Sequence, residues 1–184
     1  MAAKTKLILK ESRNEENPMR SVFIEKVLLS SGATADALVK AKKLLEMLSG
    51  SKVQVIASRK RIPDFDVNPG LEVGVRVTLR DQKAIDLLKR LLGAIDNKLK
   101  KKQVSENHFS FGIEEYIEIP GTEYQRDIGI RGLNVTVVFV RKGLRVKRKK
   151  IKSSSVPKKQ HISKEEIIKF MEKEYKTKFV QEEK

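Results

Sequence analysis

The amino-acid sequence predicts an α+β fold: a mainly antiparallel sheet with two helices packed on one face and the other face free. Short segments that are rich in β-branched residues, or in which apolar and polar residues alternate, are typical of strands. Two longer segments carry apolar residues at the spacing of a buried helix face. Along the chain the order is strand, helix, strand, strand, helix, strand, strand, which favours an antiparallel sheet covered on one side.

The first elements follow a turn signal at Asn17-Pro18. Residues 21–29 are rich in β-branched side chains and predict a strand that ends at residues 30–32, Ser-Ser-Gly. The spacing of the leucines predicts a helix over residues 34–48. Gly50 is a natural stop after that helix, because glycine readily adopts the left-handed backbone conformation.

Residues 52–57 predict a second strand, which leads into a long loop, residues 58–70. Loops of this length in compact domains are usually functional or disordered. Residues 72–80 predict the clearest strand, because aliphatic residues alternate there with small, basic or hydroxyl-bearing ones. The polar side of this strand is expected on the free face of the sheet. Its side chains there are Arg76, Thr78 and Arg80.

The second half of the chain supplies one more helix and two strands. Apolar spacing predicts the helix from Asp81 to about Leu99, closed by a lysine-rich segment whose cations suit a helix C-terminus. Residues 109–119 and 130–141 predict the two strands, joined by a turn-rich link.

Positive charge is concentrated in one block. The 184 residues carry a formal net charge of +16, and residues 128–164 hold 12 Lys and Arg but no Asp or Glu. The densest run, residues 141–159, repels itself unless a polyanion neutralises it. It lacks the apolar face of a membrane-surface helix. We therefore expect a large RNA as partner and no membrane; the alternative is a solvated tail that aids only solubility.

This charge distribution suggests three parts. Residues 1–16 form a polar leader, residues 17–141 an α+β RNA-binding core, and residues 142–184 a basic extension that ends in a helix. A capping box of Ser163 and Glu166 starts that helix. Its apolar side chains fit docking either on the core or on RNA.

Signatures of catalysis and of cofactor binding are absent from the sequence. The lack of Cys excludes disulfides, thiolate nucleophiles and Cys-ligated metals. His108 and His161 have no partner at metal-ligand spacing, and no phosphate-binding glycine motif or GxSxG sequence occurs. No apolar run approaches the roughly 20 residues that span a bilayer, and the start lacks a signal-peptide core. We expect no enzyme activity, metal or cofactor.

The long loop carries a second basic feature. Arg59, Lys60 and Arg61 stand at its base, where cations suit contacts with phosphate. Pro63 limits the freedom of the loop, and Phe65 suits stacking on a base or ribose. The alternative is that Phe65 packs in the core and the cations are solvated.

The free sheet face is the third feature. Arginine forks bind phosphate through two hydrogen bonds, and a threonine hydroxyl reaches phosphate or a 2′-OH. The alternative is an ordinary solvated face. Because the strands lack the dense aromatic pattern of RNA-recognition motifs, we expect recognition of RNA shape and backbone more than of base sequence.

Four segments resemble a known family, the 5S-rRNA-binding proteins of the large ribosomal subunit (universal large-subunit protein five), in its archaeal type. The segments are NPMRSVFIEKV (residues 17–27), GLEVGVRVTLR (70–80), FSFGIEEYIEIPG (109–121) and IGIRGLNVTVV (128–138). The resemblance covers roughly residues 17–180. It implies a cytoplasmic, non-catalytic structural constituent of the ribosome, present there as a monomer.

The resemblance also implies partners. These are 5S rRNA, large-subunit rRNA in the central protuberance, P-site tRNA and a protein of the small-subunit head. The residues expected at tRNA are Arg59, Lys60, Arg61, Pro63 and Phe65. The residues expected at rRNA are Arg20, Ser30, Ser51, Arg76, Thr78, Arg80, Arg131, Arg145, Lys147, Arg148, Lys149 and Lys150.

Two expected rRNA contacts depart from the family pattern. Ser30 stands where the family usually has Asn, and Ser51 where it often has Gln. A serine hydroxyl still forms hydrogen bonds but reaches less far than a side-chain amide. A different class of function stays open beside the ribosomal one: a free-standing RNA chaperone or nucleic-acid-binding regulator that uses the same basic surface.

Overall fold

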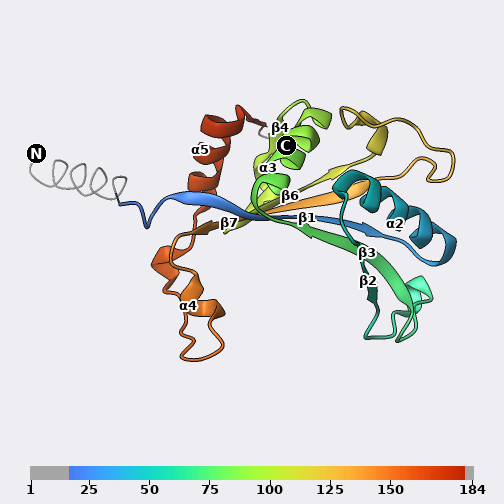
Figure 1. Cartoon of the computed structure of the whole chain (residues 1–184), viewed down its shortest axis with the longest axis horizontal. Coiled ribbons are helices and arrows are strands. Elements are labelled where there is room, and N and C mark those ends of the chain that lie inside the picture. Colours follow the sequence, from blue (N-terminus) through green and yellow to red (C-terminus); the bar gives the residue numbers. More distant parts are fainter. Residues whose placement is uncertain (1–16, 181–184) are drawn as a thin grey trace, which may run out of the picture.

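The structure is a computed structural model that describes residues 17–180, so the predicted leader lies outside the described residues. Figure 1 shows a twisted sheet with helices on one side and two parts of the chain that project from the other. The strands are β1 (Val22–Gly32), β2 (Gln54–Ala57), β3 (Glu72–Leu79), β4 (Lys98–Lys100), β5 (Val104–Ser105), β6 (His108–Ile113), β7 (Leu133–Arg141) and β8 (Lys178–Val180). The α-helices are α2 (Ala35–Ser49), α3 (Asp81–Ala94), α4 (Arg145–Arg148) and α5 (Lys164–Tyr175).

The predicted α+β class is confirmed. Six strands form one sheet in the order β2-β3-β1-β7-β6-β5, and every neighbouring pair is antiparallel. Helices α2 and α3 cover one face (Figure 1). Their leucines pack on the aliphatic side of the central strands, and the fully buried side chains there include Leu44, Leu45, Leu88, Val27 and Val135.

Helix α2 ends as predicted. Gly50 has φ +57° and donates its backbone N–H to the Glu46 carbonyl oxygen at 2.9 Å. A side chain in this left-handed conformation would be strained, which is why glycine suits the position.

The predicted end of β1 was wrong. The strand continues through Gly32, because Ser30 pairs with Arg76 of β3 on one side and with Asn134 of β7 on the other. The partner strand makes room: a Cβ on Gly74 would lie 3.2 Å from the Ser31 carbonyl oxygen. A Ser-Ser-Gly sequence therefore stays extended here, because strands flank it on both sides.

The predicted strand 109–119 was too long. Strand β6 ends at Ile113, the residue opposite Leu133, where its partner β7 begins. Beyond it the chain turns into a short 3₁₀ helix, Tyr116–Glu118. The Tyr116 ring is fully buried, and its hydroxyl accepts a hydrogen bond from the Gln125 backbone N–H at 2.8 Å.

The predicted second helix was also too long, and its buried stripe was partly misplaced. Asp96 and Asn97 both have positive φ, so α3 ends at Ala94. Leu99 lies instead in β4, which pairs in parallel with β8 from the end of the described chain. The lysine-rich segment that follows is β4 and a 3₁₀ turn rather than a helix end. The stripe also includes Leu87 and Leu91, whereas Ile85 and Ile95 are half-buried.

The last helix docks on the body of the protein. The capping box is present, with the Ser163 hydroxyl accepting from the Glu166 backbone N–H at 3.3 Å. Ile167 and Met171 are fully buried. The Phe170 ring lies edge-on to Phe139 of β7, with ring centroids 5.7 Å apart. Of the two sites considered for these side chains, the core is the one they occupy.

Candidate nucleic-acid interface

The face of the sheet opposite α2 and α3 is built from three cross-strand rows. Directly opposed residues of an antiparallel pair point to the same face, so the register defines each row. None of these side chains is buried and none is acidic, whereas the alternate residues of the same strands form the core. The rows are Gln54–Arg76–Ser30–Asn134–Gly112, Thr78–Leu28–Thr136–Ser110 and Lys26–Val138–His108.

The predicted polar residues of β3 lie on this free face. Arg76 and Thr78 are exposed between buried valines and Leu79. Arg76 donates from Nε to the Gln54 Oε1 atom at 3.0 Å, which holds its guanidinium over the neighbouring strand β2. Arg80 follows β3 immediately and is exposed. Both arginines therefore point away from the valine core.

Other residues of the face were missed from the sequence. Lys26, Gln54, Asn134 and Ser110 share it with the predicted arginines. The alternation of residues 133–139 already indicated a polar side of that strand. What the sequence lacked was the register that sets this side next to β1 and β3.

A glycine-lined hollow of about 500 Å³ lies at one end of the face. Gly32, Gly112 and Gly132 contribute to its wall, so backbone is exposed there without covering side chains. Gly132 is obligatory in this geometry, because a Cβ on it would lie 2.8 Å from the Glu114 carbonyl oxygen. Glycines at such places allow close approach of another backbone.

The loop between β2 and β3, residues 58–70, is an ordered hairpin rather than a disordered segment. Ile62 and Val67 exchange backbone hydrogen bonds at 2.8 and 3.1 Å, and Val67 is buried. A 3₁₀ turn, Pro63–Phe65, forms the tip, and the three predicted cations at the base are exposed. Phe65 is 77% exposed, so the alternative that it packs in the core was wrong.

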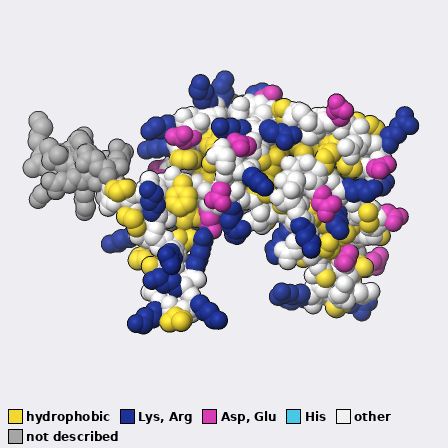
Figure 2. All heavy atoms as spheres, viewed as in Figure 1, with side chains coloured by type: hydrophobic (Ala, Val, Ile, Leu, Met, Phe, Trp, Pro, Cys, Tyr) yellow, Lys and Arg dark blue, Asp and Glu magenta, His cyan; other side chains and the backbone are white. Residues whose placement is uncertain are grey.

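The basic segment forms a second projection, which we call the basic arm (residues 142–161). It contains α4, and its five predicted rRNA-binding residues are exposed: Arg145, Lys147, Arg148, Lys149 and Lys150. Arg148 forms an ion pair with Glu25 of β1, which ties the arm to the sheet. Figure 2 shows Lys and Arg side chains on the arm and on the loop, with a hollow between the two projections.

Arg141, the first residue of the predicted basic run, is not available to RNA. Its side chain is 6% exposed, and its guanidinium contacts both Glu166 carboxylate oxygens at 2.6 and 2.7 Å. Partial burial alone would raise the pKa of Glu166, but hydrogen bonds from Arg141 and the Ser163 backbone outweigh this, and the pKa is lowered. The pair joins the last residue of β7 to the start of α5.

The remaining predicted residues lie around the face rather than on it, apart from Ser30. Arg20 is exposed just before β1, and Arg131 is half-buried just before β7. Ser51 lies in the turn after α2, where its hydroxyl donates to the Ser49 carbonyl oxygen at 3.3 Å. Ser30 is half-buried in the first row of the face.

Within residues 17–180, no group of three or more His, Cys, Asp or Glu side chains is placed to hold a metal ion. No helix of the described chain is long and apolar enough to cross a membrane.

Comparison with known proteins agrees with this geometry. The family model for the C-terminus of the ribosomal uL5 proteins matches residues 72–177, which include β3, β6, β7, the basic arm and α5. The chain belongs to the ribosomal uL5 family. The β3, β6 and β7 residues of the free face and the whole arm thus fall in a region that the family shares.

Similar full-length proteins extend the match to the remaining strands. The large ribosomal subunit protein uL5 of Nanoarchaeum equitans is 43% identical over 162 residues, which cover 86% of this chain and 96% of that protein. The proteins of the same name from Sulfolobus acidocaldarius and Archaeoglobus fulgidus are 38% and 35% identical over 90% and 89% of this chain. The matches cover 94% and 93% of those proteins. The resemblance to the archaeal type is confirmed.

Proposed function

We propose that this uL5-family chain, a structural protein of the large ribosomal subunit in the cytoplasm, binds 5S rRNA through the free face of its sheet. The observation that carries the proposal is the outward orientation of Arg76, Thr78 and Arg80 on a face without acidic residues. The sheet holds these side chains in fixed positions, so little conformational entropy is lost when a folded RNA binds.

The two projections extend the interface. The basic arm suits large-subunit rRNA, because its cations stand close together and outside the sheet. Together the arm and the face would fasten 5S rRNA to the large-subunit rRNA in the central protuberance. The hairpin 58–70 suits the P-site tRNA, with Phe65 exposed at its tip. A contact with a protein of the small-subunit head completes the proposed set of partners.

Arg80→Ala tests the sheet face. We expect the substitution to weaken binding of a 5S rRNA transcript by about 1–3 kcal/mol, since it removes a charged hydrogen bond to phosphate. Filter binding at fixed salt measures the dissociation constant. Lys89→Ala is the control, because it removes one positive charge from the exposed side of α3, away from the free face.

An unchanged affinity for Arg80→Ala, or an equal loss for Lys89→Ala, would argue against the sheet face. In the second case only net charge would matter, as expected of non-specific binding.

A further inference from the structure

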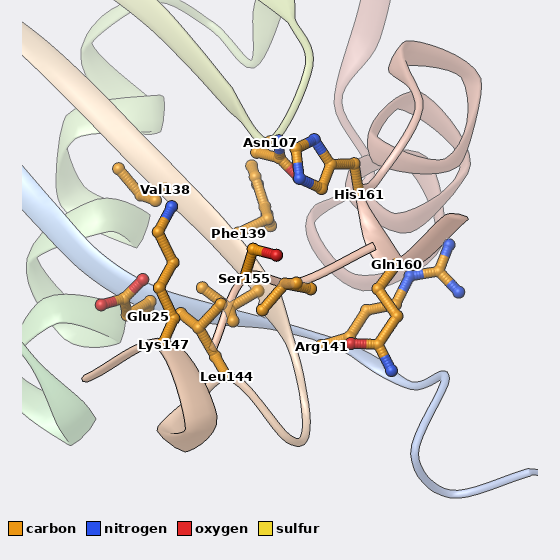
Figure 3. Close-up of a pocket in the computed structure, with 12 residues that line it drawn as sticks. Glu25, Asn107, Val138, Phe139, Arg141, Leu144, Lys147, Ser155, Gln160 and His161 are labelled. Carbon is orange, nitrogen blue, oxygen red and sulfur yellow. The ribbon is translucent and has the colours of Figure 1, made fainter. Parts of the chain in front are cut away.

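A pocket of about 300 Å³ lies where the basic arm crosses the free face of the sheet (Figure 3). Its walls come from three segments: strand β7, the part of the arm around α4, and the part of the arm just before α5. Ser155 lies near the middle of the lining residues in Figure 3. Val138 of the lining also belongs to the third row of the free face, so the pocket continues the surface proposed to contact rRNA.

The walls of the pocket are largely apolar. Val138, Leu144 and Val156 are half-buried and contribute aliphatic surface, and Val140 beneath the arm is 7% exposed. Aliphatic side chains of this kind suit the flat face of an aromatic ring, because contact there removes apolar area of both partners from water.

The rim of the pocket is polar and has free hydrogen-bonding groups. The Asn107 Oδ1 atom accepts from the Ile162 backbone N–H at 2.8 Å, which leaves the amide nitrogen of Asn107 as a donor. Within the described chain, neither this nitrogen nor the Gln160 amide nor the His161 ring has a hydrogen-bond partner. Amides and imidazole at a rim are the groups that pair with the edges of a base.

The charge around the pocket favours an anionic occupant. The Lys147 ammonium lines it and forms no ion pair within the described residues. Glu25 is the acidic residue of the lining, and it is already paired with Arg148. An apolar peptide side chain would fill the walls but leave the amides and the ammonium without partners, which is unfavourable.

We propose that this pocket receives one unpaired nucleotide of the bound rRNA. The base lies between the aliphatic walls, its edge pairs with the amides of Asn107 and Gln160, and Lys147 contacts its phosphate. This inference rests on the proposed function, namely that the chain binds rRNA. It adds one base contact to a surface that otherwise suits RNA shape and backbone.

Ser155→Phe tests the pocket by filling it without a change of charge. Ser153→Phe is the matched control, because Ser153 is also exposed, stands two residues away on the same segment and does not line the pocket. Dissociation constants for 5S rRNA and large-subunit rRNA transcripts are measured by filter binding over a series of salt concentrations. Both variants are first checked for the wild-type fold by their amide NMR spectra.

For the transcript that supplies the nucleotide, we expect Ser155→Phe to weaken binding about 5- to 100-fold, the range of one lost base-stacking contact. The slope of affinity against salt should stay at the wild-type value, because the phosphate contacts are retained. Ser153→Phe should match wild type. Gln160→Ala, which removes a rim amide without filling the pocket, should give a smaller loss.

A second measurement does not depend on the RNA partner. Titration of AMP and UMP into the full chain should shift the side-chain amide NMR signals of Asn107 and Gln160 in wild type and Ser153→Phe, but not in Ser155→Phe. If the two Phe variants bind rRNA equally and these amides stay in place, the pocket proposal fails while the proposed function stands. If wild type binds neither transcript with salt-sensitive affinity, the proposed function itself fails.

Discussion

At the residue scale, the ion pair between Arg141 and Glu166 holds the two ends of the basic arm together. Arg141 ends β7 and Glu166 lies in the first turn of α5, so the pair closes the arm at its base. A nearly buried guanidinium keeps its charge at low cost only while a carboxylate faces it. The most basic part of the chain thus depends on a structural pair that RNA does not touch.

Glu166→Gln should lower the free energy of unfolding by about 1–3 kcal/mol, because Arg141 loses the charge that compensates its burial. Urea unfolding at neutral pH measures this change. Glu165→Gln is the control, since its neighbouring carboxylate is exposed.

The same pair predicts a pH dependence. The pKa of Glu166 is lowered from 4.5 in the folded protein, so its contribution to stability is complete above pH 4.5 and is lost as the pH falls through the lowered pKa. Wild type should therefore lose more stability than Glu166→Gln across that acid range. Parallel pH profiles for the two proteins would contradict this role.

At the element scale, the hairpin 58–70 should act separately from the sheet face. Changing Arg59, Lys60 and Arg61 together to Ala should leave the affinity for 5S rRNA nearly intact and reduce protection of tRNA on ribosomes that carry the variant. The reason is geometric: the loop projects beyond the sheet as a hairpin closed by the Ile62–Val67 pairing (Figure 1). Filter binding and chemical footprinting of tRNA measure the two effects.

The matched control for this variant removes three positive charges from α2 on the covered side of the sheet. These residues are Lys40, Lys42 and Lys43, all exposed. Their replacement by Ala should leave tRNA protection unchanged. Equal loss of 5S rRNA affinity and tRNA protection in the hairpin variant would instead make the hairpin part of the 5S site.

How far the elements could be predicted depended on whether local or distant contacts decide them. Alternation alone located β3, and the Ser163 capping box located α5, because both signals lie within a few residues. The extension of β1 through Gly32 and the end of β6 at Ile113 depend on partner strands far away in the sequence. No local pattern reports those partners.

The candidate site divides in the same way. Arg76 and Thr78 could be placed on the free face from the period of their own strand. Asn107, Val138 and Ser155 could not be joined into a pocket, because three separate segments meet there only after the arm folds back. Residues that act alone are visible in a sequence, whereas constellations need the tertiary structure.

At the scale of the whole molecule, the proposed ribosomal role separates from that of a free RNA chaperone by sedimentation. We expect the chain to migrate with large subunits in stoichiometric amount, and to stay with them at moderate salt, because the face, the arm and the hairpin bind together. Gradient centrifugation of an extract of the cells that produce it measures this distribution. Recovery mainly at the top of the gradient would support the chaperone instead.

The anchored base of the basic arm also has a kinetic consequence. Asn107 accepts the Ile162 backbone N–H while the Phe139 backbone N–H donates to the Asn107 carbonyl oxygen, so the arm leaves and re-enters the body at neighbouring points. A chain tied at both ends explores a small volume, which raises the effective concentration of its cations beside the sheet. An RNA already held by the face therefore meets the arm at once, and full release requires both grips to open within the same brief interval.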